Sequence, residues 1–343
     1  MLLIQESSPH TGAQGSTARM MGTVAAATLP GLVAMVHFFG WGVAFNVAWA
    51  VAVALATEAL VLRLRGRPIR TQLLDGSALV TGTLLGLAVP PTSPWWMVGI
   101  GAAFSIGIAK HLYGGLGQNP FNPAMVGYVV LLISFPLEMS GWLPAHTQAP
   151  SPLDALATQW LPGNLDGITA ATALDALKHN SGLTATELYA QHPSFGAWGG
   201  SGWEWVNGAF LLGGLVLLYL RVIDWRLPAG MLFGLAAMAL LFWGGSGSDT
   251  RGAPLMHLTS GGTMLAAFFI VTDPVTASTT PLGRLVYSTG VGVLAYVIRA
   301  WGGYPDGIAF AVLLMNFAAP LIDHYTPPRT YGHPGAGAGQ GRP

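Results

Sequence analysis

The sequence contains no cysteine and very little charge. The missing cysteine excludes disulfides, thiolate metal ligands, cysteine-bound clusters and haem attachment through CxxC, so a redox role would need an organic cofactor or a metal held by other ligands. Charged residues make up only 8% of the 343 residues, whereas a soluble domain has roughly 25%. Fourteen basic residues balance fourteen acidic ones, and this lack of basic excess argues against a nucleic-acid partner.

Hydrophobic residues are abundant instead, at 52% of the chain. This content excludes disorder, and the scarcity of charge leaves too little polar surface for a soluble globule. We therefore expect an all-α polytopic membrane protein, with spans of about 20 apolar residues each. The sequence predicts ten spans, at about 22–41, 43–62, 73–89, 95–112, 122–139, 205–221, 226–243, 255–271, 283–300 and 305–322.

The basic residues predict the orientation of these spans. With a cytoplasmic N-terminus, eleven of the fourteen lysines and arginines fall on the cytoplasmic side, and only Lys178, Arg251 and Arg299 fall outside, as the positive-inside rule requires. Both termini are then cytoplasmic, as an N-terminal tail 1–21 and a C-terminal tail 326–343. The long loop 141–204 is extracytoplasmic.

This loop divides the spans into two halves of five, 22–140 and 205–325. An odd number of spans in each half requires the halves to be inserted in opposite directions. A weak sequence echo, Lys110-His-Leu-Tyr-Gly-Gly115 and Arg299-Ala-Trp-Gly-Gly-Tyr304, favours an inverted repeat, which in transporters surrounds a central site. The alternative is that glycine-rich membrane helices resemble one another by composition alone.

The first chemically distinctive segment is Asn119-Pro-Phe-Asn-Pro123. Its two asparagines offer amide donors and acceptors to one region, which suits a planar heterocycle. Helix capping by Asn122 with Pro123 at the first helical position explains the same residues, and residue types alone favour capping.

Acidic residues at the borders of the spans are the next candidates: Glu58, Asp75, Asp273 and Asp306. An ionisable group in a span is costly and is therefore a candidate for a functional site, although solvated interfacial carboxylates are an equal alternative. Asp273 lies in Thr272-Asp-Pro-Val-Thr276, where it can bind a cation or cap a turn. Glu58 and Asp75 flank an arginine-rich loop, which predicts salt bridges to Arg63 or Arg70, so Asp273 and Asp306 rank above them as ion-coupling candidates.

The outer loop carries Asp166-Gly-Ile-Thr-Ala-Ala-Thr172, followed by a helix start at 173–178. Physical reasoning alone predicts a turn in which Thr172 is the N-cap. Nothing in the spacing of this segment indicates more.

Together these segments resemble the NqrB/RnfD family of membrane proteins, which comprises RnfD of the Rnf complex and its paralogue NqrB of the sodium-translocating NADH:quinone reductase. The matching stretches are Lys110–Gly127, Gly261–Thr276 and Asp166–Thr172, and the resemblance covers roughly 20–325. It implies a urea-transporter-like fold and FMN bound covalently through its phosphate to Thr172, although Ala170 departs from the family's usual glycine. It also implies riboflavin as a second flavin, with Asn119 and Asn122 as the matching residues.

The resemblance further implies a membrane flavoprotein component of an ion-translocating ferredoxin:NAD⁺ oxidoreductase in the bacterial inner membrane. Electrons would cross the membrane through FMN and drive H⁺ or Na⁺ translocation. The implied partners are the other Rnf proteins (RnfA, RnfB, RnfC, RnfE and RnfG), a flavin transferase for maturation, and ferredoxin and NAD indirectly. We expect no metal site and no catalytic residue in this chain. The competing interpretation is a small-solute channel or transporter of the same fold, because fold alone does not decide function.

Overall fold

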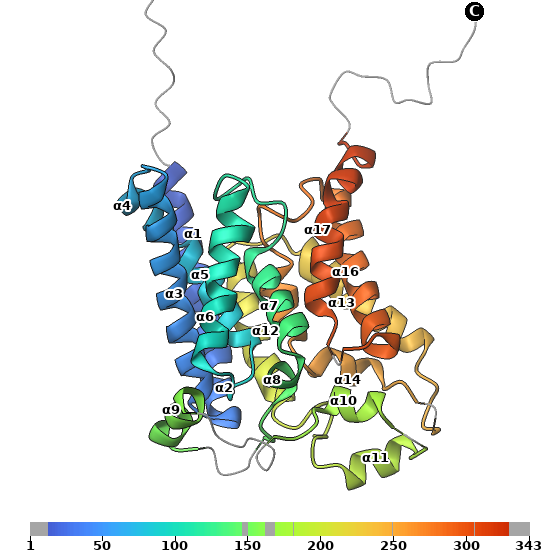
Figure 1. Ribbon diagram of the computed structural model, residues 1–343. Helices are drawn as coiled ribbons and strands as arrows, with labels where there is room; N and C mark the ends of the chain where they lie inside the picture. The colour runs from blue at the N-terminus through green and yellow to red at the C-terminus, as the bar shows by residue number, and fades with distance from the viewer. Residues whose placement is uncertain are drawn as a thin grey trace, which may run out of the picture. The chain divides into compact units, whose positions relative to one another are not determined.

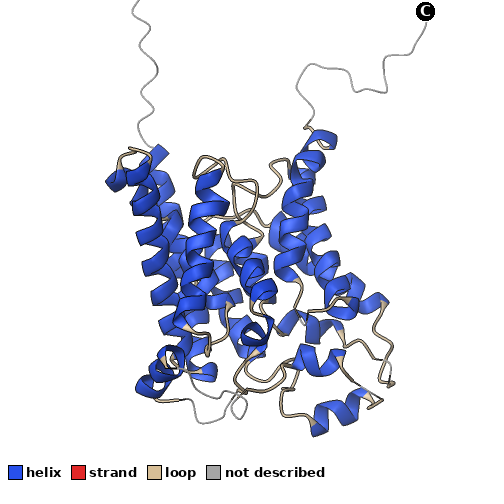
Figure 2. Ribbon diagram, viewed as in Figure 1, coloured by secondary structure: helices blue, strands red, loops and turns tan. Residues whose placement is uncertain are grey.

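The computed structural model describes residues 13–145, 150–161, 169–180, 182–248, 250–304 and 306–328. These residues form helices joined by turns and loops, and the described part of the chain contains no strand beyond one isolated bridge between Phe195 and Gly200 (Figure 2). The all-helical class predicted from composition is therefore confirmed.

Contacts divide the chain into two compact units. The first unit comprises residues up to 119, 123–171 and 205–223. Its helices are α1 (Ala13–Ala27), α2 (Leu29–Phe39), α3 (Gly42–Leu64), α4 (Ile69–Leu73), α5 (Ser77–Ala88), α6 (Trp95–Phe104), η1 (Ser105–Leu112), α7 (Pro123–Ser134), α8 (Pro136–Ser140), α9 (Pro152–Trp160) and most of α12 (Trp203–Tyr219). Within this unit α3 packs along α5 and α6 (Figure 1).

The second unit comprises residues 120–122, 172–204 and 224 onward. Its helices are α10 (Ala173–Lys178), α11 (Ala185–Gln191), α13 (Arg226–Leu241), α14 (Pro254–Thr259), α15 (Thr263–Leu265), η2 (Ala266–Ile270), α16 (Pro281–Trp301) and α17 (Ile308–Tyr325). Helix α16 packs against both α13 and α17 (Figure 1).

Four helical segments among the described residues are long and apolar enough to cross a membrane. These are Thr17–Phe39, Gly42–Leu64, Pro281–Trp301 and Ile308–Tyr325. Further apolar helices are shorter: Ser77–Ala88, Pro123–Ser134, Trp203–Tyr219 and Arg226–Leu241. The structure thus supports a membrane-spanning protein, whereas the count of ten spans stays a prediction.

Several boundaries follow the sequence closely. The break predicted at Gly40-Trp41-Gly42 is confirmed, because α2 ends at Phe39, Gly40 adopts a φ of 89° and α3 begins at Gly42. Helix α7 begins at Pro123, as expected of a proline at the first helical position. Residues 1–12 and 329–343 of the predicted tails lie outside the described residues.

Three expected boundaries differ from the helices of the structure. The N-terminal tail, predicted as 1–21, includes the start of α1. The predicted span 73–89 begins only at Ser77, because Gly76 has a φ of 78° and ends the preceding turn. The predicted span 255–271 is interrupted at Gly261, whose φ of 60° separates α14 from α15. A non-glycine side chain is strained in this left-handed region.

Two segments are wound as π-helices, η1 and η2. Such wide turns are rare and are frequently found at functional sites. Segment η1 carries Lys110 and His111, and η2 ends three residues before Asp273. Both therefore adjoin residues that the sequence singled out.

Glycine allows α13 and α16 to approach closely. A Cβ atom placed on Gly292 of α16 would overlap the backbone of Met231 and Leu235, and one on Gly234 of α13 would overlap the backbone of Thr289. Small residues at such contacts are typical of membrane helices, which associate by close van der Waals packing.

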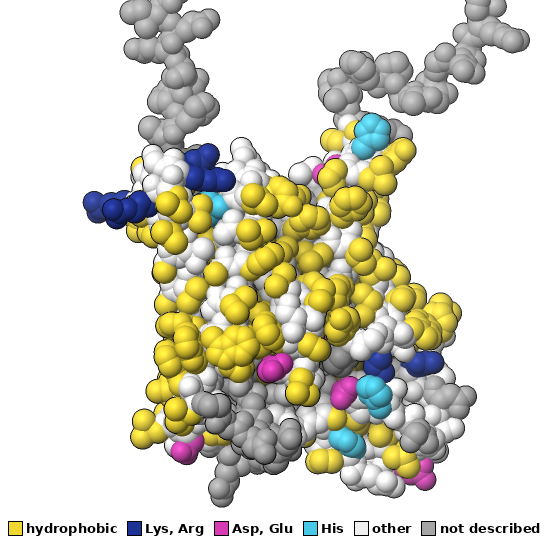
Figure 3. All heavy atoms as spheres, in the orientation of Figure 1, with side chains coloured by type: hydrophobic (Ala, Val, Ile, Leu, Met, Phe, Trp, Pro, Cys, Tyr) yellow, Lys and Arg dark blue, Asp and Glu magenta, His cyan; other side chains and the backbone are white. Residues whose placement is uncertain are grey.

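In the first unit, exposed basic side chains gather at one end of the helices, and exposed apolar side chains lie along their sides. In the first unit, the arginines of the α3–α4 connection are exposed and gather near α4, while the neighbouring helix surface is hydrophobic (Figure 3). These arginines are Arg63, Arg65, Arg67 and Arg70.

Gly292→Val should destabilise the chain by about 1–3 kcal/mol, the usual cost of overpacking a close contact. Gly208→Val is the matched control, because Gly208 is an exposed glycine of α12 and a Cβ added there would meet nothing within 4 Å beyond its own helix backbone. Equilibrium unfolding in mixed micelles measures both variants. Equal destabilisation by the two variants would contradict the close-approach explanation.

Candidate functional site

Thr172 lies at the start of α10 and is partly exposed. Its Oγ1 accepts a hydrogen bond from the backbone N–H of Asp175 at 3.3 Å, and its backbone is extended, with φ −70° and ψ 163°. The predicted N-cap is therefore confirmed. Asp166, the first residue of the motif, lies outside the described residues.

Helix α10 is held by an apolar cluster within the second unit. Ala173, Leu174 and Leu177 are buried against residues of α11, α14 and the loop after α11, namely Leu188, Met256 and Phe195. Burial of these side chains stabilises the helix through the hydrophobic effect. The position of Thr172 is thus fixed from its C-terminal side.

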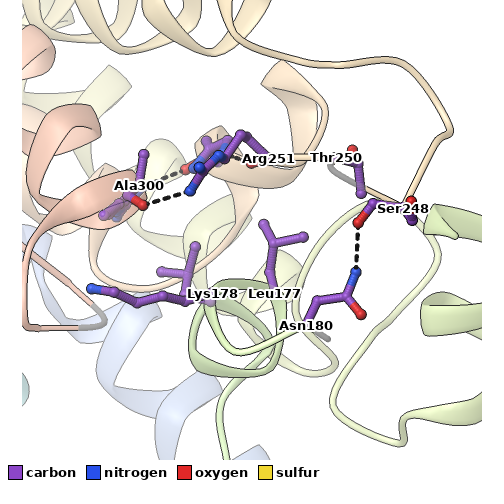
Figure 4. Close-up of a pocket in the computed structure, with 10 residues that line it drawn as sticks. Leu177, Lys178, Asn180, Ser248, Thr250, Arg251 and Ala300 are labelled. Atoms are coloured by element: carbon purple, nitrogen blue, oxygen red, sulfur yellow. Dashed lines mark hydrogen bonds between the residues drawn. The ribbon is translucent and has the colours of Figure 1, made fainter. Parts of the chain in front are cut away.

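A cavity of about 240 Å³ adjoins α10. Its lining comes from α10, the loop after α13, α14 and the end of α16, and consists of Leu174, Leu177, Lys178, Asn180, Ser248, Thr250, Arg251, His257, Arg299 and Ala300 (Figure 4). Among the described residues, the lining includes the side chains of Lys178, Arg251 and Arg299 and no carboxylate. Sequence reasoning missed this cavity, since it used the basic residues only to assign the topology.

Two of these cations are satisfied by backbone carbonyls. Lys178 Nζ donates to the carbonyl of Tyr304 at 2.7 Å, and Arg251 donates to the carbonyl of Ala300 at 2.8 Å. Burial lowers the pKa of the Lys178 ammonium, and the nearby Asp175 carboxylate opposes that shift. An anion entering the cavity would favour the charged form of Lys178.

Asn122 belongs to a buried network in the second unit. Its backbone N–H donates to Asn316 Oδ1 at 3.1 Å, and its Nδ2 donates to the carbonyl of Ile270 at 3.4 Å. The amide of Asn316 donates in turn to the carbonyl of Thr276 and to the Tyr287 hydroxyl. Asn122 therefore has a structural role: it links the end of η2 to Asn316 of α17.

Asn119 is buried as well, at 4% exposure, and is grouped with the first unit. A flavin contact by either asparagine stays a prediction.

Asp273 caps the turn after η2. Its carboxylate accepts hydrogen bonds from the Val275 N–H at 3.1 Å and the Thr276 hydroxyl at 3.0 Å. The sequence left two roles open for Asp273, cation binding and capping. The structure shows the capping role.

Asp306 is paired with a buried arginine. Its two oxygens accept from Nε and Nη2 of Arg299, both at 3.2 Å, and Arg299 also donates to the His257 carbonyl and the Thr263 hydroxyl. The guanidinium joins α16 to the break between α14 and α15. The sequence indicated Asp306 as an acid but gave no sign of this partner.

The expected partner of Glu58 was wrong. Glu58 forms a buried ion pair with Lys110 of η1 and lies 3.3 Å from His111 Nε2, away from Arg63 and Arg70. Lys110 also donates to the Ser77 hydroxyl at 2.6 Å.

Asp75, on the C-terminal side of the arginine-rich loop, also differs from the prediction. Asp75 accepts from the N–H and hydroxyl of Ser77 rather than from Arg70. Lys110 bonds to both Glu58 and Ser77, and Ser77 bonds to Asp75. The two acids thus belong to one polar cluster. Within the described residues, Glu58 Oε2 and His111 Nδ1 are buried with no hydrogen-bond partner.

Comparison with known proteins identifies the family. The family model described as NQR2, RnfD, RnfE matches residues 4–332. The chain belongs to this family. A relative from Pseudomonas aeruginosa, named as the D subunit of an ion-translocating oxidoreductase complex, is 57% identical, and the match covers 97% of each chain.

Proteins with the same name from two other bacteria agree with this assignment. The protein from Marinobacter nauticus is 52% identical, with 97% of this chain and 96% of the relative covered. The protein from Vibrio cholerae is 52% identical, with 95% and 98% covered. The resemblance drawn from the Asn-Pro-Phe-Asn-Pro and Thr-Asp-Pro-Val-Thr segments is thereby confirmed.

Lys110→Met should destabilise the chain by about 3–5 kcal/mol, because it leaves the Glu58 carboxylate buried without its counter-charge. The double variant Lys110→Met/Glu58→Gln should recover most of that loss, since no buried charge is then uncompensated. Unfolding in mixed micelles measures both, with Arg65→Met, an exposed cation, as control. A double variant no more stable than Lys110→Met would contradict the ion-pair account.

Proposed function

We propose that this chain is the membrane component of an Rnf-type ion-translocating oxidoreductase and carries electrons through FMN esterified to Thr172. The main support is that the family model matches nearly the whole chain. Relatives in this family are named as the D subunit of such a complex. The position of Thr172 at the start of a packed helix supports it.

The residues around Thr172 fit a phosphoester. Thr172 is partly exposed, and an ester oxygen at this position can still accept a hydrogen bond from the N–H of Asp175. Lys178 of the same helix and Arg251 line the cavity beside α10 and can compensate negative charge there, although Thr172 is not itself one of the residues that line it. When bound, FMN supplies the electron chemistry, and the protein supplies position and electrostatic tuning.

The wider assignment follows from the family. We infer ten spans in two inverted, urea-transporter-like halves, a bacterial inner-membrane location with both termini cytoplasmic, and a periplasmic loop 141–204. The exposed arginines next to α4 support a cytoplasmic position for that end of the first unit. The proposed partners are RnfA, RnfB, RnfC, RnfE and RnfG, with a flavin transferase for maturation and ferredoxin and NAD acting through them.

Ion coupling, to H⁺ or Na⁺, is the last part of the proposal. Asp273 is the stronger candidate, because its carboxylate is bound by neutral donors within the described residues, whereas Asp306 is neutralised by Arg299. A second flavin, riboflavin, near Asn119 and Asn122 is proposed on the family's pattern. A small-solute channel, the alternative function, would not need FMN esterified to Thr172.

Thr172→Asn should remove covalent FMN from the chain while preserving the helix, because asparagine is as good an N-cap but has no hydroxyl to esterify. The measurements are intact mass and in-gel flavin fluorescence of the denatured chain, co-expressed with a flavin transferase. Thr184→Asn, at the threonine N-cap of α11 outside the motif, should keep the flavin. Flavin retained on the Thr172 variant would refute the attachment site.

Asp273→Asn should lower the number of ions moved per electron more than it lowers electron flow, since it removes a titratable carboxylate but keeps the turn's acceptor oxygen. Ion uptake driven by ferredoxin oxidation in vesicles containing the whole complex provides the measurement. Asp306→Asn should instead reduce the amount of folded chain, because buried Arg299 loses its counter-charge. If ion uptake and electron flow fell in strict proportion in Asp273→Asn, the ion path would lie at other residues.

A further inference from the structure

Helix α9 of the first unit has two opposite faces. Ala155 and Gln159 point inward and are buried. Leu153, Leu156 and Trp160, spaced three and four residues apart along one stripe, are exposed at 79%, 39% and 46%. A stripe with this spacing forms one apolar face of a helix.

The inward face is fixed by one polar side chain. Gln159 Nε2 lies within hydrogen-bond distance of the Gly42 carbonyl at 2.9 Å, the Asn46 side-chain oxygen at 3.0 Å and the Pro91 carbonyl at 2.8 Å. Gly42 is the first residue of α3, and Pro91 follows the end of α5. Helix α9 is therefore held at the level where these helices begin and end, and Figure 1 shows it at the lower end of α3.

An aromatic group fixes the rotation of α9. Trp160 stacks on Trp95, the first residue of α6, with ring centroids 4.9 Å apart, and both rings meet Trp49 edge to face. Trp96, the next residue, is also exposed, at 40%. Tryptophan gathers at the membrane–water interface, where its apolar ring and polar N–H are both accommodated.

We propose that α9 lies in the interfacial layer of the bilayer and inserts Leu153, Leu156 and Trp160 among the lipid chains. Trp160 of this face stacks on Trp95, which is itself 36% exposed, and α9 is bonded to the start of α3, an apolar helix long enough to cross a membrane; both favour lipid as the occupant. The helix carries one acidic residue, Asp154, and no basic residue, so it binds through apolar insertion rather than through anionic headgroups.

The arrangement has a consequence for the outer loop. The residue after Trp160 begins the stretch that leads to Thr172, and the backbone N–H of Ala170 is bonded to the Trp142 carbonyl at 3.0 Å. An inserted α9 keeps Leu161 at the membrane surface. The inference holds whether or not Thr172 carries a flavin, so the two can fail separately.

Depth measurement by spin labelling tests the proposal, and the absence of native cysteine makes each label unique. The full chain with Leu153→Cys is labelled and placed in nanodiscs of phosphatidylethanolamine and phosphatidylglycerol. Val33→Cys, at an exposed position of α2, is the lipid reference, and Thr186→Cys, at an exposed position of α11, is the aqueous reference. Relaxation by oxygen and by a water-soluble nickel chelate reports the surroundings of each label.

We expect the oxygen-to-nickel accessibility ratio at Leu153 to be several-fold higher than at Thr186 and close to that at Val33, with and without the remaining proteins of the complex assembled on the labelled chain. A ratio equal to that of Thr186 would overturn the proposal and place α9 in water. Loss of accessibility to both reagents on assembly would also overturn it, because a protein partner would then cover this face.

Discussion

A membrane helix that is interrupted exposes carbonyl and amide groups that lipid cannot satisfy, and this constraint governs the structure. At three such places a polar side chain from another segment supplies a partner. Arg299 donates to the His257 carbonyl before the break at Gly261. Asn316 donates to the Thr276 carbonyl after η2, and Gln159 donates to the Gly42 and Pro91 carbonyls. The burial of Arg299, Asn316 and Gln159 is thus explained by where helices stop.

Sequence reasoning succeeded where the determining signal is local. Gly40 and Gly42 mark a helix break, Pro123 a helix start and Thr172 an N-cap, and each of these depends on residues within one turn. Composition alone was sufficient for the all-helical membrane class, because so little charge leaves few other classes open.

Reasoning failed where partners are distant in sequence. Glu58 and Lys110 are 52 positions apart, and the expected partners of Glu58 were simply its nearest arginines. Arg299 was used only to assign the topology, yet its side chain is buried and bonded to the helix break 36 residues earlier. The Trp95–Trp160 stack is equally remote. No periodicity within one helix encodes such pairings, because they depend on how helices pack.

The two π-helical segments have a consequence for how the family can vary. A π-turn holds one more residue than an α-turn, so η1 behaves as a fixed insertion within an otherwise α-helical segment. Deleting one residue from Ser105–Leu112 would let the wide turn close to an α-turn, which absorbs the deletion and leaves the flanking helical segments nearly in register. Successive side chains diverge by about 100° in an α-helix and by less in the wider π-turn, so the π-winding brings the neighbours Lys110 and His111 to the same carboxylate of Glu58. The double contact with the buried charge on α3 therefore depends on the winding of η1 as well as on the identity of its residues.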